Sequence, residues 1–180
     1  MSPISDSARV SLFVADYAAP DAIQKLNIIG AGWAVTGVNP ETGLTAPHAV
    51  VAFIDVPPDH YGEDFAFTLT LRGPDGQPVR VPGPTGQVEP LRIAQTLRAE
   101  EPQFPPEVNV PRRTVWSHTQ VALNMSNGIP VQVGSLYTWT LDIDGNTRPA
   151  WAVSFYVPGP RPGPVFGGPA GPATIPDVQV

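Results

Sequence analysis

The fold is decided by residues 137–157, which read YTWTLDIDGNTRPAWAVSFYV. Large apolar residues take every second position in both halves of this stretch. They are Tyr137, Trp139, Leu141 and Ile143, followed by Trp151, Val153, Phe155 and Val157. The triplet Asp144-Gly145-Asn146 between the halves has the composition of a tight turn. A period of two on both sides of such a turn predicts a β-hairpin with one buried face.

Further apolar runs of strand length precede this hairpin. They cover residues 10–16, 25–29, 33–35, 49–55, 65–71, 88–97 and 115–125. Gly30 and Gly32 indicate a bulge or tight turn, and the sequence Pro-Asp-Gly-Gln at residues 74–77 indicates another turn. The helix signal is weak and is confined to about one turn at residues 20–26.

About eight short strands joined by polar turns, without alternating helices, predict an all-β fold. We expect a single two-sheet antiparallel β-sandwich with an extended C-terminal arm. Its parts are an N-terminal extension at residues 1–8, a sandwich domain at residues 9–157 and a Pro/Gly-rich arm at residues 158–180. A length of 180 residues is typical of one domain with a core of its own.

Composition excludes several classes of function. The chain has no Cys, which rules out disulfides, Cys-ligated zinc, iron–sulfur clusters and thiol nucleophiles. A net charge of −6 disfavours binding to nucleic acid, because phosphate backbones repel acidic proteins. No apolar run reaches the roughly 20 residues of a membrane helix, and residues 1–9 do not read as a signal peptide. We therefore expect neither nucleic acid nor membrane as a partner.

The residues that could carry chemistry do not form a recognisable site. The three histidines, His48, His60 and His118, lack the spacing of metal ligands. Ser117 and His118 are adjacent in a predicted strand and therefore point to opposite faces. Gly30-Ala31-Gly32 lacks the third glycine and the helix of a dinucleotide site. We expect no catalytic residues, no metal and no cofactor, and hence no enzyme.

One acidic segment leaves an alternative open. Residues 55–64 hold Asp55, Asp59, Glu63 and Asp64 around two prolines, as a solvated loop or a calcium-binding loop would. Residues 142–146 also begin like a calcium loop, but the glycine and acidic residue required further along are missing, so a hairpin turn explains them. The four tryptophans are expected in the core, and whether any exposed aromatic binds a ligand stays open.

The arm is set apart by its prolines and glycines. Proline fixes φ and removes a hydrogen-bond donor, so residues 158–180 cannot enter a sheet interior or form a helix. Twenty residues of polyproline-like chain reach about 60 Å. Its apolar residues are the predicted anchors on a partner, in a groove or along a sheet edge. They are Val165, Phe166, Ile175, Val178 and Val180.

Several short segments resemble, in order and spacing, the DUF6941 family of small actinobacterial proteins. They are LFVADYA at residues 12–18, KLNIIGAGW at 25–33, DGQPV at 75–79, VALN at 121–124 and YTWTLDIDG at 137–145. The similarity covers about residues 9–157. It implies a β-sandwich without a known catalytic role, so no site residues are transferred. The sequence departs from the family at the C-terminal arm.

These observations favour a non-enzymatic structural protein. The specific expectation is an actinobacteriophage virion component, either a capsid decoration protein or a minor capsid protein, made in the host cytoplasm. Its partners would be other subunits of the assembly, namely the major capsid protein and/or itself. The alternative is a free cytoplasmic actinobacterial module that binds a protein or a ligand. An enzyme that acts through residues 55–64 is a third and weaker hypothesis.

Overall fold

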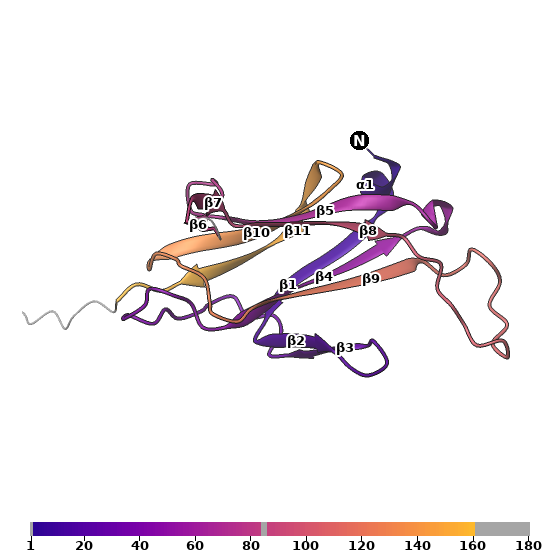
Figure 1. The fold of residues 1–180 in the computed structure, drawn as a ribbon, viewed down its shortest axis with the longest axis horizontal. Coiled ribbons are helices and arrows are strands. Elements are labelled where there is room, and N and C mark those ends of the chain that lie inside the picture. Colours follow the sequence, from indigo (N-terminus) through magenta and orange to yellow (C-terminus); the bar gives the residue numbers. More distant parts are fainter. Residues whose placement is uncertain (1, 84–85, 161–180) are drawn as a thin grey trace, which may run out of the picture.

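The computed structural model describes residues 2–83 and 86–160, and strands make up most of its regular structure (Figure 1). The helical elements in these ranges are α1 (Pro3–Ser7) and the 3-10 turn η1 (Pro58–His60). The strands are β1 (Arg9–Ala15), β2 (Tyr17–Pro20), β3 (Leu26–Ile29), β4 (His48–Val56), β5 (Asp64–Arg72), β6 (Arg80–Pro82), β7 (Val88–Pro90), β8 (Arg92–Arg98), β9 (Ser117–Met125), β10 (Ser135–Ile143) and β11 (Asn146–Val157). The all-β prediction is confirmed.

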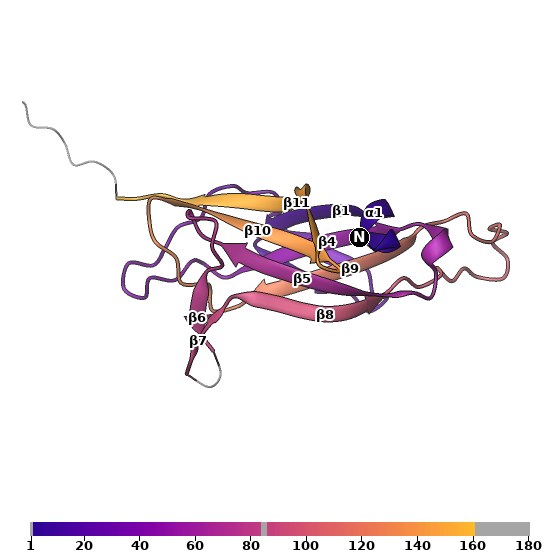
Figure 2. The same cartoon turned by 90° about the horizontal axis from the view of Figure 1, so that it is seen from above.

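These strands form four sheets. One has the order β1-β4-β9, a second has the order β11-β10-β5-β8, and β2-β3 and β6-β7 are two-stranded. Every pairing is antiparallel. The prediction of two sheets is therefore only partly met. The small sheets contain Pro20, Pro82 and Pro90, which lack the donor needed to continue a ladder, and the β6–β7 hairpin projects away from the body (Figure 2).

The two larger sheets lie as separate layers in Figure 1 and share one hydrophobic cluster. From the three-stranded sheet it takes Val14, Val50, Ile54 and Val56; from the four-stranded sheet it takes Phe65, Phe67, Leu69, Leu71, Tyr137, Trp139, Leu141, Ile143 and Phe155. Trp139 is the bulkiest of its fully buried side chains. Burial of such side chains contributes about 1.5–3 kcal/mol each, so this shared core is what holds the layers together.

The hairpin at residues 137–157 has the predicted form. Ile143 pairs with Asn146, and the two residues between them, Asp144 and Gly145, have φ angles of 52° and 77°. Asp-Gly is favoured in such a turn because both positions need positive φ. The register shifts between Thr140 and Asp142, where residues 148–151 of β11 bulge out around a proline.

Three local predictions were wrong. Residues 33–35 do not form a strand, because only Val35 bridges to the edge of β11. Residues 20–26 do not form a helical turn: Pro20 ends β2, Leu26 begins β3 and residues 21–25 connect the two strands. The single strand expected at 88–97 is broken at Leu91, whose N–H donates to Val79 and whose carbonyl accepts from Leu71. This exchange with a neighbouring segment separates β7 from β8.

Residues 1–8, set apart in the sequence as an extension, contain α1. Ser2 caps this helix by accepting a hydrogen bond from the Ser5 N–H. Ile4 and Ala8 are 2% and 5% exposed and belong to the main cluster. The short helix therefore packs on the body of the protein and contributes to its core.

Candidate functional site

The five predicted anchors of the arm, Val165, Phe166, Ile175, Val178 and Val180, lie outside the described residues. The root of the arm is described, and it is fixed in the sheet. Val157 is fully buried, pairs with Ser135 and accepts a hydrogen bond of 2.7 Å from the Gly134 N–H. The next three residues, 158–160, are exposed. The arm thus begins abruptly at a rigid point at one end of the body (Figure 1).

An exposed apolar row lies beside this root. Tyr156 pairs with Leu136 across β10 and β11, and Val35 bridges to Tyr156 from the other side. Two hydrogen bonds fix the bridge, from Thr36 N–H to the Tyr156 carbonyl at 3.1 Å and from Tyr156 N–H to Ala34 at 2.8 Å. The exposed fractions of Val35, Leu136 and Tyr156 are 58%, 51% and 41%. We call these three residues the arm-base patch.

The patch departs from the polar character of the same sheet face. One pair further along the same two strands, Thr138 and Ser154 are joined by a hydrogen bond of 2.8 Å between their hydroxyl oxygens. Neighbouring positions on the other face, such as Phe155, point into the core. Because side chains alternate between the two faces of a strand, Tyr156 must point outward. Packing in the core therefore does not explain its aromatic ring.

A buried aromatic cluster supports the strands beneath the patch. The Trp33 ring meets the Phe155 ring edge-on at 5.8 Å and the His48 ring at 5.6 Å. His48 Nδ1 lies 2.9 Å from the Ala46 carbonyl, which can only accept, so this nitrogen carries the proton. Burial lowers the pKa of His48, and the hydrogen bond to Ala46 acts in the opposite direction. His48 is thus a neutral core residue.

Three of the four carboxylates in the acidic segment at residues 55–64, all except that of Asp59, have separate partners. Asp55 is hydrogen-bonded to His118. Glu63 lies 3.2 Å from His60 Nδ1, and Asp64 lies 3.4 Å from Arg98. Within residues 2–83 and 86–160, no three acidic or histidine side chains are grouped so that they could hold a metal ion. The two interpretations of this segment, as a solvated loop or a calcium-binding loop, therefore both stay open.

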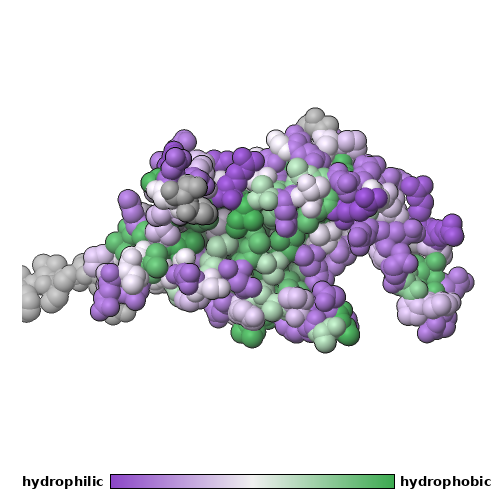
Figure 3. Space-filling view, in the orientation of Figure 1, coloured by the Kyte–Doolittle hydropathy of each residue, from purple (hydrophilic) through white to green (hydrophobic). Residues whose placement is uncertain are grey.

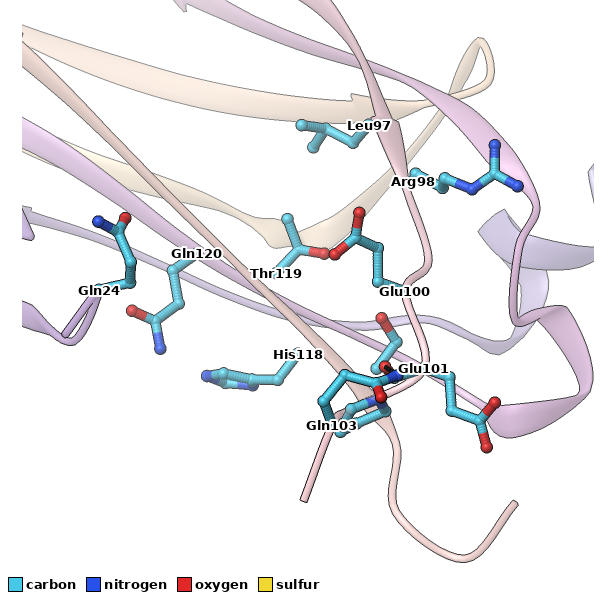
Figure 4. A pocket seen from close by; sticks show the side chains of 11 residues that line it. Gln24, Leu97, Arg98, Glu100, Glu101, Gln103, His118, Thr119 and Gln120 are labelled. Atoms are coloured by element: carbon cyan, nitrogen blue, oxygen red, sulfur yellow. Dashed lines mark hydrogen bonds between the residues drawn. The ribbon is translucent and has the colours of Figure 1, made fainter. Parts of the chain in front are cut away.

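A hollow of about 580 Å³ lies between the end of β8 and the start of β9 (Figure 4). Thr119 points to the side of Leu97 and Glu100, whereas His118 and Gln120 lie on the other side of β9. Ser117 is buried while its neighbour His118 is exposed, as their alternation requires. Ser117 and His118 therefore do not face each other as a nucleophile and its base would.

Sequence reasoning missed the arm-base patch. Its only signal was that Leu136 and Tyr156, at the ends of the predicted hairpin, are apolar on the face where other positions hold Thr and Ser.

None of the helices in the described part of the chain could cross a membrane. No family model matches the sequence, and no curated protein matches it. The resemblance to the DUF6941 family therefore stays a prediction.

Proposed function

We propose that this chain is a non-enzymatic structural protein of an assembly. In its specific form it is a phage virion component, a capsid decoration or minor capsid protein. Its two larger sheets act as a rigid β-sandwich body that presents the arm-base patch and the arm. Its partners are the major capsid protein and/or other copies of this chain.

The observation that carries this proposal is the position of the arm-base patch next to the root of the arm. Apolar side chains that gather on a surface rimmed by polar residues are typical of protein–protein contacts. A tyrosine that is fixed by main-chain bonds on both sides adds contact area at little entropic cost. The patch and the arm thus offer a partner two attachment points at one end of the body.

The composition of the arm supports the same proposal. Residues 158–180 have too few apolar residues to build a core of their own, but a polyproline-like chain loses little freedom when it is laid along a partner. Residues 158–160 leave the sheet where Val157 is anchored. A partner bound to the patch would therefore lie close to the start of the arm. Either contact would raise the effective concentration of the arm or the patch at the partner, so each would strengthen the other.

The test is incorporation into virus particles. A chain that lacks residues 158–180 keeps Val157 and therefore the whole described sheet, so circular dichroism should show an unchanged strand signal. We expect it to be absent from purified particles that contain the full chain. Normal incorporation of the shortened chain would overturn the role of the arm, and a full-length chain that stays a free monomer would favour the cytoplasmic binding module.

A further inference from the structure

One margin of the body is open. β8 is the last strand of the four-stranded sheet, and β9 is the last strand of the three-stranded sheet. Among the residues that the structure describes, no main-chain group of β8, and none of residues 117–124 in β9, is hydrogen-bonded to a segment beyond its own sheet. Two unpaired strand edges therefore border the same gap between the layers.

Apolar side chains line this gap. Ile93 and Leu97 of β8 pair with the buried Leu69 and Phe65 and share their inward face. On β9, Leu123 pairs with the buried Val50 and faces inward in the same way. Ile93, Leu97 and Leu123 are each only half-buried. We call this margin, with these three residues and Val121, the open edge; Figure 3 shows hydrophobic residues gathered between the layers there.

The opposite margin of the two larger sheets differs, because segments of the chain meet there. There β1 contacts β11, and residues 34–36 bond to the outer edge of β11 at Tyr156. Proteins normally cover or charge an exposed edge strand, because its free main-chain groups invite another strand to pair. A hollow of about 580 Å³ lies at the open edge, beside Leu97 and Thr119. The gap has the character of a site for an added strand.

We infer that the open edge receives residues 175–180 of a neighbouring copy of this chain. This inference rests on the proposed function, because it names where the arm binds. Beyond Pro160 the sequence is dominated by proline and glycine as far as residue 172, and such chain cannot pair along a strand. The final residues, Asp177-Val178-Gln179-Val180, contain neither proline nor glycine and alternate apolar with polar. Val178 and Val180 would enter between the layers, while Gln179 would face water.

The length of the arm favours a neighbouring copy. Residues 161–174 would span about 43 Å if extended like polyproline, whereas the three strand spacings from β11 to β8 cover only about 15 Å. The arm starts at β11, and the sheet order β11-β10-β5-β8 places the open edge of the same copy on the far side of the sheet. A proline-stiffened spacer favours extension to another molecule over a return across its own sheet.

Cysteine cross-linking of the full chain tests this inference, because the native sequence contains no Cys. Chains carrying Val178→Cys and chains carrying Leu123→Cys are mixed and oxidised. We expect a disulfide-linked dimer of the two different chains. Thr119→Cys, at the same margin, serves as a second acceptor that removes no apolar side chain. Ser154→Cys, exposed on the outer face of β11, is the matched control and should not link.

Two results would overturn the inference. One is that Val178→Cys links to Leu123→Cys and Thr119→Cys no better than to Ser154→Cys. The other is that a chain carrying both Val178→Cys and Leu123→Cys closes its disulfide within one molecule at high dilution, which would place the arm on its own edge. If cross-linking fails while particle incorporation still depends on residues 158–180, the assembly function stands and only this docking site falls. If the shortened chain is incorporated normally, the proposed function falls as well.

Discussion

Leu136 and Tyr156 lie directly opposite each other in β10 and β11, and both side chains are turned away from the core. They are neighbours on one face of an antiparallel ladder, where such a pair stabilises the sheet by about 0.2–1 kcal/mol. The neighbouring Val35 does not cover them, because its own side chain is more exposed than either of theirs. The pair is therefore the first place to test the contact with another molecule that we propose.

The double variant Leu136→Ser and Tyr156→Ser should reduce incorporation into particles by about tenfold or more, since exposed aromatic anchors carry much of the binding energy in interfaces. The free energy of unfolding should change by only about 1 kcal/mol. Particle content is measured by quantitative blotting, and stability by urea denaturation. Val88→Ser, which removes a 56% exposed valine on β7, is the matched control and should be incorporated normally. Equal incorporation of all three proteins would remove the patch from the account.

Stability should fall as the solution is acidified through the titration range of His48. Burial lowers the pKa of His48 in the native chain below the ordinary 6.5, so the unfolded chain binds the proton more readily. The free energy of unfolding should therefore be constant above about pH 7 and decrease between about pH 7 and pH 5. The contribution of His48 is isolated by its substitution.

His48→Phe should flatten that decrease, because an uncharged ring can keep the contacts with Trp33 and Phe155. Thermal unfolding followed over the same pH range measures the effect. Val88→Ser, which removes an exposed side chain and no titratable group, should retain the slope of the unmodified protein. A His48→Phe protein with an undiminished slope would show that another group is responsible.

Gly128→Ala should destabilise the protein far more than Gly43→Ala. Both glycines have positive φ, 70° and 69°, so the backbone strain of an alanine is matched. A Cβ at Gly128 would lie 2.0 Å from the Thr45 carbonyl oxygen, whereas a Cβ at Gly43 would meet nothing within 4 Å. We expect about 1–2 kcal/mol at Gly43 and at least twice that at Gly128. Similar losses in chemical denaturation would mean that the contact between residues 45 and 128 is unimportant.

Ile4→Ala should lower the free energy of unfolding by about 2–5 kcal/mol, the usual loss for a buried isoleucine. This loss would show that α1 belongs to the folded body. The control is Asp6→Ala in the same helix, which breaks only an exposed ion pair of 3.6 Å with Arg148 and should cost at most about 1 kcal/mol. Ile4→Ala with the stability of the control would return residues 1–8 to the status of an extension.

The sequence predicted those parts of the fold in which the local pattern and the packing agree. In the stretch 137–157, alternation and an Asp-Gly turn demand the same hairpin, and that hairpin formed. Prediction failed where a distant partner decided the outcome. Leu91 is apolar and looks like part of a strand, yet its main chain bonds to Val79 and Leu71, so the strand breaks there. Residues 33–35 likewise form only one bridge, between Val35 and Tyr156 of β11.

The candidate site was harder to predict than the fold. Leu136 and Tyr156 are apolar residues in strands, and a sequence cannot show that the layer beneath them is already filled by Tyr137 and Phe155. The open edge depends on which strands come last in each sheet, which is a property of topology. The absence of strand and helix from the arm, in contrast, can be predicted from the sequence alone, because proline lacks the N–H donor that regular pairing needs.

The most direct measurement is density-gradient sedimentation of a lysate in which this chain is produced from its own genome together with its neighbouring genes. The account predicts that the chain migrates with large particles, that residues 158–180 are required for this, and that the double variant Leu136→Ser and Tyr156→Ser is depleted from the same fraction. A chain that remains at the top of the gradient as a free monomer, with or without those residues, would contradict it.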